Sequence, residues 1–132
     1  MRTTISLMII FIFISCKSQK LIVENGIYGT FSGSVKFYDF WYKYTLQLNK
    51  DNTFVYEMRT QDANSYCEGK WKLSEKKLLL DCKEPSVEEI IGGKMPKTEF
   101  VVEIINKDNL KYRIIYDKNM NYKDITLKRQ GE

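Results

Sequence analysis

Apolar and polar residues alternate along most of the chain from Gly26 onward, in short segments separated by turn residues. Alternation with a period of two places successive side chains on opposite faces of a β-strand. Short strands with turn signals roughly every eight to twelve positions are typical of an antiparallel sandwich or barrel. No stretch keeps a helical periodicity over a useful length. The pattern therefore predicts an all-β fold.

The clearest predicted hairpin joins residues 41–49 to residues 53–59, because the apolar faces of the two segments match. A three-residue loop, Lys50-Asp51-Asn52, brings these faces into line. Such a loop needs a left-handed residue at its last position, and Asn52 tolerates that conformation. The predicted cross-strand pairs are Leu48 with Phe54 and Leu46 with Tyr56.

The tetrapeptide Asn-Lys-Asp-Asn of this first hairpin recurs at positions 106–109. We expect the same loop there, since the resulting register again pairs apolar residues only. The predicted pairs are Phe100 with Tyr116, Val102 with Ile114 and Ile104 with Tyr112. A last strand is predicted over 123–129, with Ile125 and Leu127 facing inward.

The segment 83–97 does not alternate and has two interpretations. Ser86 followed by Glu89 fits a helix capping box, and Gly92-Gly93 would end such a helix after about one or two turns. The same stretch also fits an irregular strand over 87–91 at the edge of a barrel. The pattern leaves both open.

The N-terminal stretch MRTTISLMIIFIFISC indicates where in the cell the protein is located. Arg2 precedes an apolar run over 5–14, which is shorter than the roughly twenty residues that cross a bilayer and has the dimensions of a signal peptide. Ser15-Cys16 resembles the lipobox of bacterial lipoproteins. The resemblance implies a diacylated Cys16 that anchors the protein to a membrane of the cell envelope; an ordinary secreted protein and an uncleaved anchor are the alternatives. The expected parts are signal peptide 1–15, lipidated cysteine and tether 16–25, and one domain, 26–132.

Cys67 and Cys82 lie in another predicted hairpin, formed by 67–73 and 76–82 around Ser74-Glu75. For a turn of two residues or of four, the predicted pairs are Cys67 with Cys82 and Trp71 with Leu78. Directly opposed β-carbons are about 4.5–5.5 Å apart, close to what a disulfide needs. With the third cysteine lipidated in an oxidising compartment, we expect a structural disulfide. Two reduced core thiols, or a redox or metal role, are the alternatives.

The composition removes several classes of function. The chain has no histidine, so Cys–His and Ser–His catalytic pairs are impossible and the commonest metal ligand is missing. Glu88-Glu89 would point to opposite faces of a strand or into solvent, which is no catalytic dyad. The net charge is only +4, and the basic residues are scattered along the chain among 17 acidic ones, with no patch or run visible in the sequence. We therefore expect no enzyme, no cofactor, no metal and no nucleic-acid partner.

Several short motifs resemble the lipocalin-like proteins of bacteria. Gly26-Ile27-Tyr28 stands where that superfamily keeps a Gly-x-Trp-type motif, and Asp51-Asn52-Thr53-Phe54 looks like its turn into the third strand. Gly69-Lys70-Trp71 and Leu127-Lys128-Arg129 fit later strands. The resemblance covers about 26–129 and implies a small up-and-down, or meander, barrel of about eight strands. Side chains nearly fill the interior of such a barrel, or leave room for one small ligand.

Inward aromatic side chains are the candidate ligand-binding residues of this barrel: Tyr42, Tyr44, Phe54, Tyr56 and Trp71. The stretch 37–44 holds six aromatic rings, which would line a pocket mouth, dip into a membrane interface or pack in the core. We expect a membrane-anchored, non-catalytic binding module for a small apolar ligand. The alternative is an envelope protein–protein interaction or inhibitor protein with a filled barrel.

Overall fold

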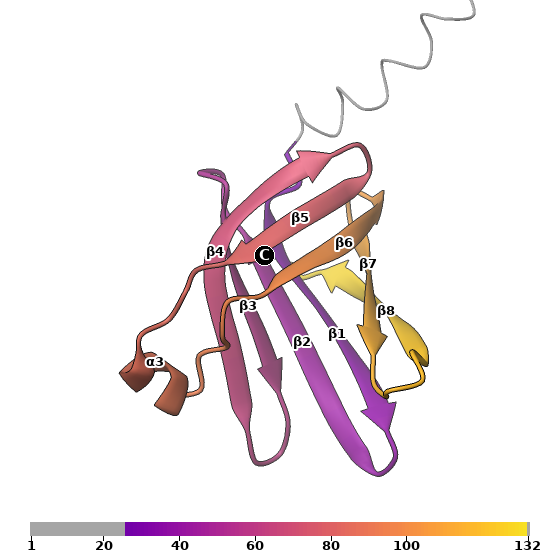
Figure 1. Cartoon of the computed structure of the whole chain (residues 1–132). Coiled ribbons are helices and arrows are strands. Elements are labelled where there is room, and N and C mark those ends of the chain that lie inside the picture. Colours follow the sequence, from indigo (N-terminus) through magenta and orange to yellow (C-terminus); the bar gives the residue numbers. More distant parts are fainter. Residues whose placement is uncertain (1–25, 132) are drawn as a thin grey trace, which may run out of the picture.

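The structure, a computed structural model, describes residues 26–131. Eight antiparallel strands follow one another around a closed barrel, in which β1 pairs with both β2 and β8 (Figure 1). The all-β, up-and-down barrel is therefore confirmed. The predicted signal peptide, lipidated Cys16 and tether lie outside the described residues. The strands are β1 (Gly29–Phe37), β2 (Phe40–Leu48), β3 (Thr53–Arg59), β4 (Asn64–Ser74), β5 (Lys77–Cys82), β6 (Glu99–Asn106), β7 (Asn109–Ile115) and β8 (Tyr122–Arg129).

The alternating sequence pattern produces the core of the barrel. On β2, alternate residues Tyr44, Leu46 and Leu48 are buried. On β8, Ile125 and Leu127 face inward as predicted. Fully burying a leucine or isoleucine side chain stabilises a fold by about 1.5–3 kcal/mol, so this shared inward face holds the strands together.

The β2–β3 hairpin has the predicted register, with Leu46 opposite Tyr56 and Leu48 opposite Phe54. Asn52 adopts the expected left-handed conformation, with a φ of 64°. The side chain of Asp51 fixes the turn, because its Oδ1 accepts a hydrogen bond from the Thr53 backbone N–H at 3.1 Å. Local sequence chemistry therefore determines this hairpin.

The predicted register of the β6–β7 hairpin is wrong by two residues. The observed pairs are Val102 with Tyr112 and Ile104 with Leu110, and Tyr116 lies beyond β7. The repeated tetrapeptide forms a tighter turn here, in which Asn106 pairs with Asn109. Asn106 Oδ1 accepts hydrogen bonds from the Asp108 N–H at 3.0 Å and the Asn109 amide at 2.9 Å. The side chain of Asn106 thus fixes the β6–β7 turn, as the side chain of Asp51 fixes the β2–β3 turn.

The β4–β5 hairpin shows the same two-residue error. Its turn is Glu75-Lys76, with Glu75 left-handed at a φ of 57°. The observed pairs are Gly69 with Cys82, Trp71 with Leu80 and Leu73 with Leu78, so the predicted pairs Cys67 with Cys82 and Trp71 with Leu78 are wrong. A shift of two keeps the same residues inward, which is why the hydrophobic pattern alone could not detect the error.

The disulfide between Cys67 and Cys82 is present, but it runs diagonally between the strands, with a Cα–Cα distance of 5.7 Å. Gly69 is the residue directly opposite Cys82. A β-carbon on Gly69 would lie 1.8 Å from the Asp81 carbonyl oxygen and 3.1 Å from the Cys82 α-carbon. The strands can approach closely enough for the diagonal bond because this position has no side chain.

The segment 83–98 leaves the barrel wall between β5 and β6 and contains the short helix α3 (Val87–Ile91). Ser86 and Glu89 form the capping box, so the helical interpretation is the correct one of the two. After α3 the chain returns to β4, where Lys94 forms a parallel bridge with Tyr66. The segment 83–98, called the α3 excursion, therefore covers the part of β4 that extends past the end of β5.

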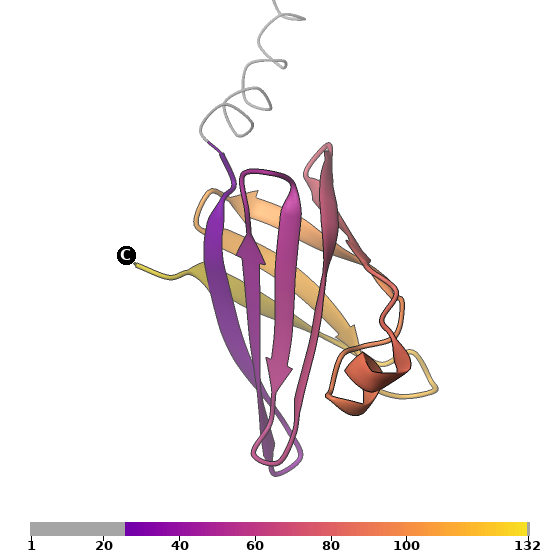
Figure 2. The ribbon, with the colours of Figure 1, turned by 90° about the vertical axis from the view of Figure 1, so that its left-hand side faces the viewer.

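The barrel has two different ends (Figures 1 and 2). At the N-terminal end, the chain enters at Gly26 beside the turns 49–52, 75–76 and 107–108. At the far end lie the turns 38–39 and 60–63, the α3 excursion and the loop 116–121.

Arg129 closes the barrel at the N-terminal end. Its guanidinium carbon lies 4.7 Å from the centre of the Phe31 ring, and its Nε donates a hydrogen bond to the Lys107 carbonyl oxygen at 3.1 Å. It also forms an ion pair with Asp108 at 3.1 Å and a hydrogen bond with the Tyr28 carbonyl oxygen. One side chain thus joins β1, β8 and the β6–β7 turn.

Candidate functional site

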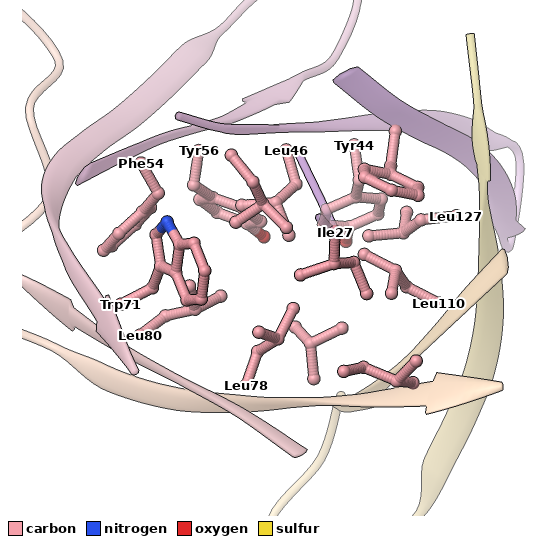
Figure 3. Close-up of a cluster of buried hydrophobic side chains, with 14 of the residues drawn as sticks. Ile27, Tyr44, Leu46, Phe54, Tyr56, Trp71, Leu78, Leu80, Leu110 and Leu127 are labelled. Atoms are coloured by element: carbon pink, nitrogen blue, oxygen red, sulfur yellow. The ribbon is translucent and has the colours of Figure 1, made fainter. Parts of the chain in front are cut away.

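Four of the five predicted ligand-binding residues point into the barrel, where other core side chains surround them (Figure 3). Tyr42 is only partly buried and packs against the core at the far end. The side chains of Tyr44, Phe54, Tyr56 and Trp71 are 9% exposed or less. They belong to the packed core.

Trp71 lies toward the N-terminal end, and its contacts there differ from those of Tyr44 and Tyr56. Its indole Nε1 donates a hydrogen bond to the Asn49 carbonyl oxygen at 3.2 Å. Its ring centre lies 6.2 Å from that of Tyr28. Trp71 therefore ties the β2–β3 turn to β4 and helps to close this end.

The middle of the barrel is filled with side chains. Phe31, Leu46 and Leu78 each have 0% of their surface exposed, although they come from different parts of the barrel wall. A water-sized void against any of them would leave some of that surface accessible. Close packing of this kind is typical of a protein core.

Toward the far end, the core becomes an aromatic cluster of Tyr44, Tyr56, Phe100 and Tyr112. The ring centres of Tyr56 and Phe100 are 4.8 Å apart, and those of Tyr44 and Tyr112 are 6.0 Å apart at a steep angle. Such tilted pairs are favourable arrangements of aromatic rings. Sequence reasoning missed Phe100 and Tyr112 as members of this site, although both belong to inward-facing positions of the predicted strands.

The tyrosine hydroxyls of this cluster stay neutral at physiological pH. Burial, and then the neighbouring Tyr112, raises the pKa of Tyr44 to about 12. Burial also raises the pKa values of Tyr56 and Tyr112 above the ordinary range. The cluster therefore presents apolar rings with neutral hydroxyl groups.

Large apolar side chains are exposed around the far end, and we call them the apolar rim. They come from the β1–β2 turn, from α3 and from the β7–β8 region, three segments that surround this end (Figures 1 and 2). Within residues 26–131, ten of the fourteen exposed large hydrophobics belong to the rim, with exposed fractions of 47% to 88%. They are Tyr38, Phe40, Trp41, Val87, Ile90, Ile91, Ile115, Tyr116, Met120 and Tyr122.

The α3 part of the rim is held in place although none of its residues is buried. Lys94, which is buried, forms ion pairs with Glu89 at 2.8 Å and with Glu68 of β4 at 3.1 Å. The hydrogen bond from Lys94 and a second from the Ser86 N–H lower the pKa of Glu89 to about 2. The Glu89 and Glu68 carboxylates also raise the pKa of Lys94. These contacts attach the excursion to the barrel wall.

A separate groove of about 640 Å³ lies on the outside of the wall, where β3, β4 and β5 meet. Its lining includes Glu68, Lys70, Asp81 and Lys83, so charges of both signs face it. It also includes Gly69, where β4 and β5 approach closely. This mixed lining selects no ligand class.

Within residues 26–131, no group of three or more Cys, Asp or Glu side chains is arranged to hold a metal ion. None of the helices in this part of the chain is long and apolar enough to cross a membrane. The geometry defines a closed, eight-stranded antiparallel β-barrel protein with an apolar rim at one end. No protein-family model, no curated protein and no solved structure matches the chain.

Proposed function

We propose that the chain is a lipid-anchored, non-catalytic binding protein of the bacterial cell envelope, with a lipocalin-like barrel whose far end binds another envelope protein. The apolar rim is the observation that carries this proposal. Exposed apolar patches rimmed by polar residues mark interaction sites on soluble domains. Aromatic residues and methionine are enriched in the cores of protein interfaces, and the rim contains Trp41, Tyr38 and Met120.

The position of the rim favours a partner away from the anchoring membrane. The described chain enters the barrel at the N-terminal end, and the rim lies at the opposite end (Figure 1). A lipidated Cys16 would hold the N-terminal end toward the bilayer, so the rim would face the surrounding compartment.

A protein partner fits the rim better than a small ligand does. Small-molecule sites enclose most of the ligand surface in a concave pocket. The rim residues instead project from three separate segments, while Leu46 and Leu78 in the middle of the barrel have no exposed surface. A broad contact across the end of the barrel uses the rim without requiring a deep cavity.

The binding proposal is tested by placing a photo-crosslinking amino acid at Trp41, Ile91 or Met120 of the full chain in the cells that produce it. We expect the same discrete protein adduct from all three positions. Leu79 and Val101 are the matched controls, because they are exposed apolar residues on the barrel wall outside the rim. Equal labelling from wall and rim positions would exclude a specific rim contact, and so would the absence of a common adduct.

The anchor is tested separately with Cys16→Ser. One acyl chain binds a membrane only marginally, whereas two or more hold it firmly. We expect the wild-type protein in the membrane fraction and the variant in the soluble fraction or unprocessed. Unchanged processing and fractionation would contradict the lipoprotein assignment while leaving the rim proposal intact.

A second candidate function is binding of a small apolar ligand, as the sequence first suggested. The observation in its favour is a ring of half-buried side chains toward the far end, which includes Tyr42, Met58 and Tyr112. Mass spectrometry of lipids that co-purify with the non-lipidated domain tests this candidate. A stoichiometric ligand that is lost in Tyr112→Ala, but retained in the rim variant Ile91→Ala, would favour it over the protein partner.

A further inference from the structure

Positive charge is concentrated at the N-terminal end of the barrel. Three turns, the strand residues beside them and the end of β8 contribute seven cations and three carboxylates there. A further carboxylate, Glu103, lies opposite Lys77 but forms an ion pair with Lys111, and the two charges cancel. The remaining described residues contain eleven cations and twelve carboxylates, so they have almost no net charge. The cations are Lys50, Lys72, Lys76, Lys77, Lys107, Lys128 and Arg129, and the carboxylates are Asp51, Glu75 and Asp108.

Two of these three carboxylates are already engaged by nearby groups. Asp51 accepts hydrogen bonds from Thr53, which lower its pKa, and Asp108 forms the ion pair with Arg129. All six lysines are exposed. Among the ion pairs within residues 26–131, none involves these lysines. Their charge therefore remains available to an external anion.

The described chain begins with Gly26 at this same end of the barrel (Figure 1). Nine residues, 17–25, separate Cys16 from Gly26. Nine residues can span at most about 30 Å, at 3.3–3.6 Å per residue. The Debye length at physiological ionic strength is about 8 Å, so lysines on this end would feel the charge of a nearby surface.

We propose that the N-terminal end of the barrel is a second binding surface, which docks on the anionic lipid headgroups of the membrane that holds the anchor. Its orientation in the cell rests on the proposed lipidation of Cys16, but its affinity for headgroups belongs to the folded domain. The six lysines supply the attraction. Docking in this orientation directs the apolar rim away from the bilayer.

The test uses the mature chain from residue 16 with Cys16→Ser, so that acyl chains play no part. Its partition is measured on vesicles of phosphatidylglycerol and phosphatidylcholine and on vesicles of phosphatidylcholine alone. We expect binding only to the anionic vesicles, weakening as salt rises. A lysine near an anionic surface is worth about fivefold in affinity, so removing three should weaken binding by roughly 100-fold.

Two triple variants remove lysines from the N-terminal end: Lys72→Gln/Lys76→Gln/Lys77→Gln, and Lys50→Gln/Lys107→Gln/Lys128→Gln. The matched control is Lys43→Gln/Lys97→Gln/Lys118→Gln, which removes the same charge from exposed positions elsewhere. We expect both test variants to lose binding and the control to keep most of it. Two test variants ensure that a folding defect in one does not decide the result.

Three outcomes would overturn the headgroup proposal. The first is equal partition on neutral and anionic vesicles. The second is equal weakening by the control variant, which would show an effect of net charge and not of this surface. The third is lysine-dependent binding to soluble polyphosphate without binding to anionic vesicles, which would identify a different polyanion. None of these results depends on whether Cys16 is lipidated or whether the apolar rim binds a protein.

Discussion

Replacing Trp71 with alanine tests how the N-terminal end of the barrel is closed. Trp71 is only 9% exposed, packs near Tyr28 and donates its indole N–H to the Asn49 carbonyl oxygen. Its removal takes away a buried ring and a link between β4 and the β2–β3 turn. The variant should remain a barrel but unfold more easily.

The size of the effect follows from these contacts. A buried aromatic side chain removes about 150–250 Å² from water, which is worth about 4–6 kcal/mol at 25 cal/mol per Å². Truncating a buried tryptophan to alanine typically costs about 3–5 kcal/mol. The hydrogen bond to Asn49 adds about 1 kcal/mol to the wild type. We expect a loss of about 4 kcal/mol for Trp71→Ala and about 1–2 kcal/mol for Trp71→Phe, which keeps most of the apolar contact.

Urea unfolding at neutral pH, followed by circular dichroism, measures both variants. The other tryptophan supplies the control, because Trp41 is 60% exposed in the apolar rim and Trp41→Ala should change stability by less than about 1 kcal/mol. A loss below about 1 kcal/mol for Trp71→Ala would refute its buried position. So would equal losses from the two tryptophan substitutions.

Three further predictions concern the β4–β5 region and α3. Replacing Cys67 and Cys82 together with alanine should lower the unfolding free energy by about 2–4 kcal/mol, and intact mass should show the wild-type pair oxidised. Gly69→Ala should lower stability by about 1–3 kcal/mol in urea unfolding, because its β-carbon meets backbone, whereas Gly131→Ala has open space and should be neutral. The depressed pKa of Glu89 stabilises the fold above its unfolded value of about 4.3, and this contribution is lost as the pH falls toward about 2. The difference in melting temperature between wild type and Glu89→Gln should therefore shrink across that window.

The fold class and the inward faces could be predicted from the sequence because both depend on local alternation. The register could be predicted only where local chemistry fixes the turn. Asp51 and Thr53 determine the β2–β3 turn, and its predicted pairs are correct. The second Asn-Lys-Asp-Asn is followed by Leu110, which has no hydroxyl to reproduce the role of Thr53. Asn106 and Arg129 contact that turn instead.

Errors of two residues are the kind that the hydrophobic pattern cannot exclude. A slip of one would turn Leu80 and Cys82 outward, whereas a slip of two leaves both inside. The disulfide prediction succeeded for the same reason, since Cys67 and Cys82 stay on one face in either register. The diagonal geometry depends on close approach at Gly69, a contact between strands that the sequence pattern does not encode.

The candidate site could be predicted only in part. The aromatic run 37–44 contains both core residues and exposed residues, and periodicity alone does not distinguish them. Tyr44 packs in the core cluster, whereas Tyr38 and Trp41 are exposed at the β1–β2 turn. The β1–β2 turn lies at the same end as α3 and the β7–β8 loop only because the barrel closes. That closure relies on contacts of Arg129 with Phe31 and Tyr28, about a hundred residues earlier in the chain.

The ordered but unburied helix is the strongest structural argument for the interaction proposal. A helix of five residues is unstable by itself, and α3 buries no side chain that would stabilise it through the core. It is held instead by the capping box, by the buried Lys94 and by a connection that begins at the disulfide-bonded Cys82. These contacts fix Val87 and Ile91 in an exposed position, where water contact is unfavourable for apolar side chains. A partner that covers them gains apolar contact without first ordering the segment, which removes part of the entropic cost of binding. A small ligand inside the barrel would not use this arrangement, because α3 lies outside the barrel wall.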